Sequence, residues 1–280
     1  MTPSQLEAAI YEAWDFADPD ASRQEFQIRS DSAKSESTRQ IWRTQIGRSY
    51  GLEKDFARAR EILGDVEAKQ AFIPPGPEKH HLRARQAIEW ARVLNSEGDP
   101  TSARSFFDRA YEEAEAAGAE GLAIDALHMI AIVEGRTGGP NQSRRWNERA
   151  LALARQSQDP DARRWRASLL NNLAWDLHDA GYAAGALTLF EEALTLRLES
   201  GQAAATEMAE WAVGRTLRTL GRHEEALAVQ RRLASEPPGA EDGYVHEELG
   251  ENLQALGREA EASVSFARAR ELLGQEPASG

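Results

Sequence analysis

Two histidine-containing dipeptides are the groups in this sequence that most resemble catalytic or metal-binding residues. His80-His81 lies in a proline-containing stretch, and His178-Asp179 lies in a helical pattern. A metal site or an acid–base pair needs further ligands or a partner at a defined spacing, and neither dipeptide has one. The chain has no cysteine, no phosphate-binding loop and no nucleophile elbow. We therefore expect a protein without enzymatic activity, metal or cofactor.

The charge balance of the chain is strongly acidic. Its 280 residues carry a formal net charge of −13, and 41% are hydrophobic and 28% charged. The resulting field repels phosphate backbones and anionic membranes, which argues against nucleic acid and membrane partners. The doublets Arg144-Arg145 and Arg163-Arg164, each followed by tryptophan, either contact nucleic acid or decorate exposed helix faces. The net charge favours exposed helix faces.

The sequence contains no segment typical of export or membrane insertion. No apolar run approaches the roughly 18 residues of a membrane-spanning helix. The N-terminal stretch lacks both a basic start and an uninterrupted apolar segment. We therefore expect a cytoplasmic protein.

The clearest structural pattern covers residues 169–194, LLNNLAWDLHDAGYAAGALTLFEEAL. Apolar side chains recur at helical spacing as far as Leu177, the pattern stops at Gly181, and it resumes from Ala186 to Ala193. This arrangement predicts two helices joined by a glycine turn. The hairpin cannot bury both apolar stripes alone, so it needs neighbouring hairpins.

The same pattern recurs along the chain and predicts a repeat fold. The turn glycines, which we expect in a left-handed conformation, are Gly98, Gly138, Gly181, Gly221 and Gly257. The small residues on the first helices, which we expect to let paired helices approach closely, are Gly47, Ala91, Ala131, Ala174, Gly214 and Gly250. We therefore predict an all-α solenoid of about six hairpins, forming a single domain over residues 38–274.

The two ends and one internal stretch depart from this pattern. Residues 1–37 predict a degenerate capping hairpin whose outer face meets water. Residues 72–81, FIPPGPEKHH, predict a stiff loop or hinge, because their prolines exclude a continuous helix. Residues 275–280 predict a disordered tail.

The six hairpins resemble tetratricopeptide repeats, on the basis of the apolar-small pair, the turn glycine and the alanine-aromatic-alanine pattern of the second helix. The spacing of the hairpins and the LNNLA sequence from Leu170 to Ala174 resemble kinesin light chains and bacterial peptide-sensing regulators. The resemblance implies a right-handed superhelix that binds proteins or extended peptides in a concave groove lined by the first helices. It also implies that Asn172 occupies a position that holds a ligand backbone or carboxylate.

Taking the first-helix residues that face away from their own second helix gives the candidate peptide-binding residues. They are Arg92, His128, Asn171, Asn172, Trp175, His178, Trp211, Arg215 and Arg218. Arg48, Glu89 and Glu248 fall on the same predicted side. Asparagine amides pair with an extended backbone, tryptophan supplies apolar area and arginine binds carboxylates. The alternatives are that the tryptophans pack between repeats, that the asparagines bridge helices and that the arginines are solvated surface charges.

Only four of the 33 basic residues are lysines, and none maps onto the lining. The lysines of the family's carboxylate clamp are therefore missing. The leading hypothesis is a scaffold that binds a protein or peptide in the groove. The alternatives are a homodimer closed through Phe266, Leu272 and Leu273, and a sensor for a small ligand or peptide.

Overall fold

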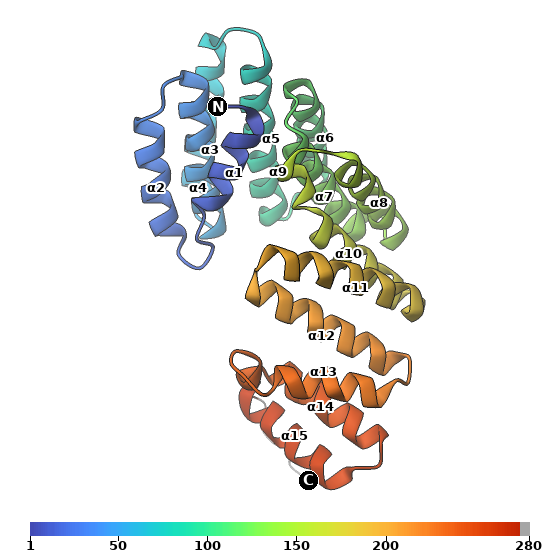
Figure 1. Cartoon of the computed structure of the whole chain (residues 1–280). Coiled ribbons are helices and arrows are strands. Elements are labelled where there is room, and N and C mark those ends of the chain that lie inside the picture. The colour runs from blue at the N-terminus through green and yellow to red at the C-terminus, as the bar shows by residue number, and fades with distance from the viewer. Residues whose placement is uncertain (275–280) are drawn as a thin grey trace. The chain divides into compact units, whose positions relative to one another are not determined.

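The computed structural model describes residues 1–274, which contain helices and no β-strand (Figure 1). The chain divides into two compact units, residues 1–169 and 170–280. No helix in the described part is long and apolar enough to cross a membrane.

The first unit contains α1 (Pro3–Glu12), α2 (Pro19–Asp31), α3 (Glu36–Leu52), α4 (Phe56–Lys69), a 3-10 helix (Gln70–Phe72), α5 (Pro77–Glu97), α6 (Pro100–Ala117), α7 (Glu120–Thr137), α8 (Pro140–Gln156) and α9 (Pro160–Arg163). Its hairpins are α3–α4, α5–α6 and α7–α8. Helix α10 (Arg166–Asp179) begins at the end of this unit and lies mostly in the second.

The second unit continues with α11 (Ala183–Ser200), α12 (Ala203–Thr219), α13 (His223–Leu233), a 3-10 helix (Gly239–Glu241), α14 (Gly243–Ala255) and α15 (Glu259–Leu272). Its hairpins are α10–α11, α12–α13 and α14–α15. A core of small and large apolar side chains joins the first two of them, for example Ala174, Phe190 and Val213. The six predicted hairpins are therefore confirmed.

Glycines at the hairpin turns adopt the left-handed conformation that the sequence predicts. The φ angles are 92° at Gly98, 84° at Gly181, 73° at Gly221 and 73° at Gly257. The third hairpin differs, because Gly138 has a φ of −111° and its neighbour Gly139 has the positive φ of 86°. The turn between α3 and α4 uses Lys54, with a φ of 63°.

Glycines on first helices also allow the predicted close approach of paired helices. A Cβ atom at Gly250 would lie 2.6 Å from ring atoms of Phe266 on α15. A Cβ atom at Gly47 would lie 3.1 Å from Cγ of Leu63 on α4. At both positions a larger side chain would overlap the second helix of the same hairpin.

The proline-containing stretch is shorter as a loop than the sequence predicts. The 3-10 helix ends at Phe72, and α5 begins at Pro77, where proline is tolerated because the first helical residue needs no N–H donor. Residues 77–81, including His80 and His81, are therefore helical. The predicted tail at residues 275–280 lies outside the described residues.

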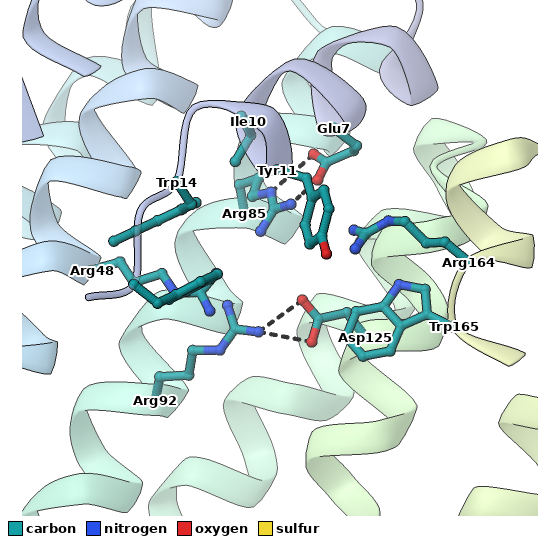
Figure 2. A pocket seen from close by; sticks show the side chains of 11 residues that line it. Glu7, Ile10, Tyr11, Trp14, Arg48, Arg85, Arg92, Asp125, Arg164 and Trp165 are labelled. Atoms are coloured by element: carbon teal, nitrogen blue, oxygen red, sulfur yellow. Dashed lines mark hydrogen bonds and ion pairs between the residues drawn. The ribbon is translucent and has the colours of Figure 1, made fainter. Parts of the chain in front are cut away.

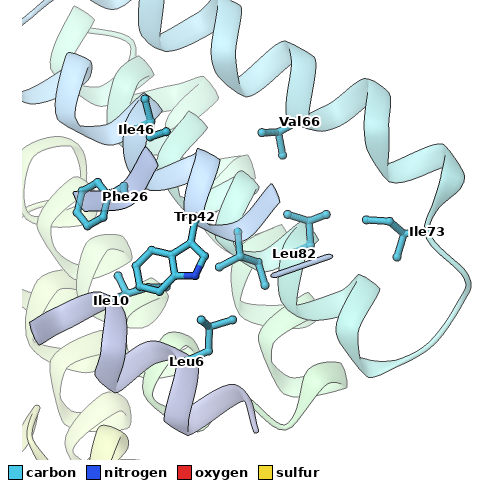
Figure 3. Packing of buried hydrophobic residues seen from close by; sticks show 9 residues of the cluster. Leu6, Ile10, Phe26, Trp42, Ile46, Val66, Ile73 and Leu82 are labelled. Carbon is cyan, nitrogen blue, oxygen red and sulfur yellow. The ribbon is translucent and has the colours of Figure 1, made fainter. Parts of the chain in front are cut away.

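Helix α1 differs from the capping helix that residues 1–37 predict. Helix α2 packs beside α3, whereas the backbone of α1 approaches α7 and α9. Leu6 and Ile10 of α1 lie in one buried cluster with Trp42 of α3 and Leu82 of α5 (Figure 3). The apolar face of α1 is therefore buried against first helices of the repeat, which differs from the capping hairpin that residues 1–37 predict.

Candidate binding sites

The first candidate site lies in the second unit, where two predicted tryptophans meet. The ring centroids of Trp175 on α10 and Trp211 on α12 are 6.2 Å apart. Trp175 also lies edge-on to Phe190, at 4.8 Å, and both indoles pack at the border of the unit's core. Both tryptophans are half-buried, so each packs against the core and leaves part of its surface accessible to solvent.

Two predicted arginines of α12 share one carboxylate on α14. Arg215 lies 3.0 Å from Oε1 of Glu248, and Arg218 donates to both Glu248 oxygens at 2.7 and 2.9 Å. The hydrogen bonds to Glu248 raise the pKa of Arg218. The Arg215 side chain is 37% exposed and that of Arg218 is 26% exposed, whereas that of Glu248 is 2% exposed. The arginines are therefore anchored at one end and accessible to solvent at the other.

The remaining predicted residues of α10 lie at the same helix face. His178 Nε2 is 2.9 Å from the Thr219 hydroxyl of α12, and its ring is 5.4 Å from the Trp175 ring. Asn171 and Asn172 are half-buried. Contacts among α10, α12 and α14 thus bring together Trp175, His178, Trp211, Arg215 and Arg218.

The predicted residues Arg92 and His128 belong instead to the first unit. Arg92 donates to both Asp125 oxygens, at 2.7 and 2.8 Å, and to Glu89 at 2.7 Å. The His128 ring lies 5.5 Å from the Trp165 ring, and burial lowers the pKa of His128. These two residues therefore form part of a second, separate candidate site.

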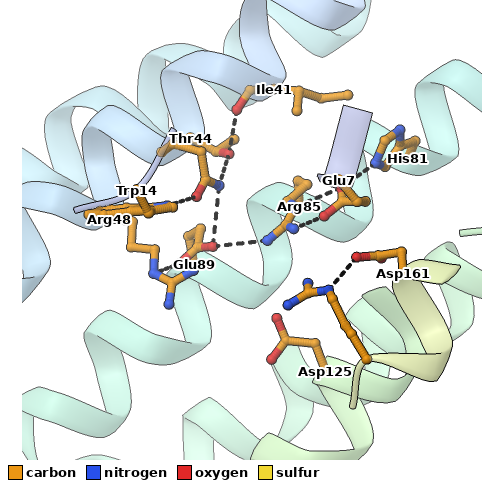
Figure 4. A network of polar contacts seen from close by, with 12 residues as sticks. Glu7, Trp14, Ile41, Thr44, Arg48, His81, Arg85, Glu89, Asp125 and Asp161 are labelled. Atoms are coloured by element: carbon orange, nitrogen blue, oxygen red, sulfur yellow. Dashed lines mark hydrogen bonds and ion pairs between the residues drawn. The ribbon is translucent and has the colours of Figure 1, made fainter. Parts of the chain in front are cut away.

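The centre of this second site is a buried network of charges (Figure 4). The Arg85 side chain is 4% exposed, lies 3.5 Å from Glu89, and pairs with Glu7 of α1 through two nitrogens, one of them Nε at 2.9 Å. His81 Nε2 lies 2.6 Å from the same Glu7 carboxylate. Burial lowers the pKa of His81 to about 4, so His81 is neutral near pH 7. Glu89 was predicted to line an open groove, but it is 1% exposed and belongs to this network.

A small pocket of about 100 Å³ lies beside the network (Figure 2). Two guanidinium groups lie over aromatic rings in its wall. Arg48 is 5.1 Å from the Trp14 ring centre, and Arg164 is 4.4 Å from that of Tyr11. The pocket is lined by Glu7, Ile10, Tyr11, Trp14, Phe16, Arg48, Arg85, Arg92, Asp125, Arg164 and Trp165. The pocket therefore lies between the end of α1 and the first helices of three hairpins.

The protonation of the network is set by burial and by the neighbouring charges. Burial and the nearby Arg92 lower the pKa of Arg48 to about 10. Burial alone would raise the pKa of Asp125, but Arg92, Arg85 and Arg48 hold it below its usual value. Arg48 and Asp125 therefore remain charged near pH 7. Among the described residues, no three histidine or acidic side chains are arranged to hold a metal ion.

Equivalent positions of the repeat carry the same ion pair in both units. Arg48 and Arg215 each follow the small residue of their first helix, and Glu89 and Glu248 each lie two residues before the small residue of the next hairpin. Arg48 Nε lies 3.9 Å from Glu89, and Arg215 lies 3.0 Å from Glu248. The first two hairpins and the last two therefore place this arginine and its carboxylate partner at the same positions.

The groups that hold α1 in place, namely Glu7, His81 and Arg85, were not predicted from the sequence. One available signal was spacing, because Leu82, Arg85 and Glu89 recur at intervals of three and four residues and so share one helix face. A charged residue on an apolar face needs a buried partner. Its partner, however, is more than 70 residues away in α1.

The apolar residues that the sequence assigned to a dimer contact pack partly within their own hairpin. The ring of Phe266 covers Gly250, and the side chain of Leu273 covers Gly243. Phe266, Leu272 and Leu273 are half-buried. Homodimer formation stays a prediction that these intrachain contacts neither require nor favour.

Both units are built from helical hairpins packed in consecutive pairs, which defines the protein as an all-α repeat protein. The tetratricopeptide repeat model matches residues 166–200, the hairpin of α10 and α11. Residues 166–200 therefore form a tetratricopeptide repeat, and the described part of the chain has the fold of structures built from such repeats. No curated protein matches its sequence.

Solved structures share this fold at low sequence identity. The apo form of RapI has a TM-score of 0.71 and 14% identity, over 96% of this chain and 75% of that chain. A putative kinesin light chain from Podosopora anserina, with nearly identical repeats of this type, has a TM-score of 0.55 and 18% identity, over 69% and 95% of the two chains. YrrB, described as having an unusual peptide-binding site, has a TM-score of 0.50 and 18% identity, over 68% and 87%.

Proposed function

We infer that this chain is a non-enzymatic scaffold that holds a protein or peptide segment against α10, α12 and α14 of the second unit. The observation that carries this proposal is the pair of half-buried tryptophans, Trp175 and Trp211, beside two partly exposed arginines. Tetratricopeptide repeat domains typically bind proteins or peptides, and the YrrB structure of similar fold is described as having a peptide-binding site.

The chemistry of this surface suits an extended acidic or carboxylate-bearing segment. The accessible indole edges offer apolar area at a low entropic cost, because tryptophan has few rotatable bonds. Arg215 is held by Glu248 at one nitrogen, and its exposed side can bind a carboxylate in a charge-assisted hydrogen bond. Asn172 lies half-buried on the same helix as Trp175, and an asparagine amide is chemically suited to contact a peptide backbone.

A displayed random-peptide library selected on the purified chain provides the test. Selected peptides should be enriched in acidic residues next to an apolar one. Their affinity, measured by calorimetry, should fall about tenfold in Trp211→Ala and in Arg215→Ala, as expected for contacts worth about 1.4 kcal/mol each. Asn172→Ala should lower the affinity in the same direction.

The matched control is Arg231→Ala, because Arg231 lies on the second helix α13 and pairs only loosely with Glu261, at 3.4 Å. This variant should bind the selected peptides as the wild type does. The proposal is wrong if Trp211→Ala, Arg215→Ala and Asn172→Ala all keep wild-type affinity while circular dichroism shows an intact helical fold.

A further inference from the structure

Helix α1 is a short, self-contained element with one buried face. Thr2 caps it through a reciprocal capping box with Gln5, and residues 13–18 connect it to α2 without helix. Leu6, Glu7 and Ile10 are 4%, 1% and 2% exposed. The opposite side, including Ala8 and Glu12, is exposed to solvent. An amphipathic helix with an acid in the middle of its apolar face is therefore bound against α3 and α5 of the first unit.

The surface under α1 is chemically matched to a carboxylate. Arg85 donates to Glu7 from Nε at 2.9 Å and also pairs with it through a terminal nitrogen. His81, one turn earlier on α5, meets the same carboxylate at 2.6 Å. Both are almost fully buried, at 4% and 3% exposure. Leu6 and Ile10 enter the apolar cluster around Trp42 on either side of this contact.

On this surface the carboxylate that α1 adds is the nearest counter-charge of Arg85. The other ion pairs of the cluster join four arginines (Arg48, Arg85, Arg92 and Arg164) to three carboxylates (Glu89, Asp125 and Asp161). Glu7 supplies the fourth negative charge. A buried guanidinium without a counter-charge is costly, so this surface requires an acidic group from whatever covers it.

We propose that the face of α5 with His81 and Arg85 is a docking site for an acidic amphipathic helix, that α1 is its resident intramolecular occupant, and that a partner's helix binds there by displacing α1. The recognised pattern is the one that α1 presents, an apolar residue followed by an acid and, three residues later, a second apolar residue. The site lies in the first unit and is independent of the peptide site proposed on α10, α12 and α14.

Because α1 contacts the first unit through few side chains, another helix can replace it. Only Leu6 and Ile10 are large apolar side chains with full burial on this helix. Ion pairs buried in this way confer specificity more than net stability, because desolvation offsets much of the Coulomb attraction. An incoming helix with the same pattern would replace each of these contacts, so the exchange is set by the relative affinities of the two helices for the site.

The probe for the test is a fluorescent synthetic peptide of residues 1–17, added to the full-length chain and followed by anisotropy. In the wild type the tethered α1 competes for the site, so binding should be weak. In the full-length Glu7→Lys variant the tethered helix carries the wrong charge, and the peptide should bind at least tenfold more tightly. A peptide carrying Glu7→Gln should bind that variant at least tenfold more weakly than the wild-type peptide.

Two control variants make the outcome specific. Glu12→Lys changes the charge on the exposed side of α1 and should leave peptide binding as weak as in the wild type. Arg215→Ala, introduced in the Glu7→Lys background, should not change the binding of the residue 1–17 peptide, since Arg215 belongs to the other site. A change in that variant alone would place the peptide at the second unit and overturn the present proposal.

Native-state hydrogen exchange of the wild type gives an independent measurement. Amides of α1 should exchange through a local opening at least tenfold faster than amides of α3 and α5. The proposal is overturned if α1 exchanges only with global unfolding, if Glu7→Lys unfolds the chain, or if the peptide binds equally weakly to the wild type and to a folded Glu7→Lys variant.

Discussion

The same repeat position carries a buried glutamate in both units, with different surroundings. Glu89 in the first unit and Glu248 in the second are 1% and 2% exposed, and each faces an arginine of the preceding hairpin. Around Glu89 the charges continue to Arg85 and Glu7 and are covered by α1. Around Glu248 they end at arginines with accessible outer sides.

The difference shows how one scaffold position serves two purposes. Where an added helix excludes water, each charge depends on a buried partner, and removing one leaves another uncompensated. Where solvent reaches the arginines, a lost partner is replaced by water, and the free side of the guanidinium remains available to a ligand. In the first unit the chain's own helix α1 therefore covers these charges, whereas in the second unit Arg215 and Arg218 remain partly exposed to solvent.

Replacing each of the two glutamates should give the largest difference in stability between the two units. We expect Glu89→Gln to lower the free energy of unfolding by about 3 to 5 kcal/mol, because Arg85 and Arg92 stay buried after their shared counter-charge is lost. We expect Glu248→Gln to lower it by about 1 to 2 kcal/mol, because Arg215 and Arg218 can be hydrated. Urea unfolding followed by circular dichroism measures both values. Equal losses in the two variants would contradict the distinction between a covered and an open cluster.

Lowering the pH should reduce the stability of the charge cluster under α1, through His81. Its pKa is lowered by burial from 6.5 to about 4, against the opposing pull of Asp161 and Glu78. Above pH 6.5 the imidazole is neutral in the folded and unfolded chain alike. As the pH falls from 6.5 to about 4, the unfolded chain takes up a proton that the folded chain does not, so about 3 kcal/mol of stability is lost over that window.

The measurement for His81 is the free energy of unfolding by urea at several pH values, compared between the wild type and His81→Asn. The variant loses the contact with Glu7 and should be less stable at pH 7, but its stability should fall less between pH 6.5 and 4. If the free energy of unfolding of the two proteins depends on pH in the same way, α1 does not shield His81 from water.

Alanine substitutions at two equivalent glycines should show the opposite order, because the loss of stability should be larger in the second unit. A Cβ at Gly250 would lie 2.6 Å from the Phe266 ring, whereas one at Gly47 would lie 3.1 Å from Leu63. We expect Gly250→Ala to cost about 1 to 3 kcal/mol, as for other overpacked contacts, and Gly47→Ala to cost less, since Leu63 needs to move only slightly. Thermal unfolding of both variants provides the comparison. A larger cost for Gly47→Ala would mean that Leu63 is held more rigidly than Phe266.

The hairpins were predictable from the sequence because the signals that define them are local. Helical spacing marks the apolar stripe, and glycine marks the turn, as at Gly181 between α10 and α11. Trp175 and Trp211, on neighbouring first helices, were both predicted to line the groove. Their contact with each other and their partial exposure could not be predicted, because both depend on how far each helix is rotated about its axis.

The position of α1 could not be predicted in the same way. An apolar stripe says which face of a helix is buried but not which part of the chain buries it, and the contacts of Glu7 with His81 and Arg85 join residues more than 70 positions apart. The pattern of Leu6, Glu7 and Ile10 does indicate that Glu7 has a buried partner, because an acid between two buried apolar residues needs one. The structure supplies that partner on α5.

Alanine substitutions at turn glycines should give the smallest loss of stability. They test whether the two units differ only in the surroundings of Glu89 and Glu248. Gly98 in the first unit and Gly257 in the second have φ angles of 92° and 73°, and both turns have open space where a Cβ would lie. Alanine at either site pays the strain of a left-handed backbone, partly offset by the lower entropy of its unfolded chain. We therefore expect about 1 kcal/mol of destabilisation for each. Urea unfolding should give equal values, because the cost is local to the turn. A clear difference would mean that the units differ in backbone rigidity as well, and that the contrast between Glu89 and Glu248 cannot be assigned to water exclusion by α1 alone.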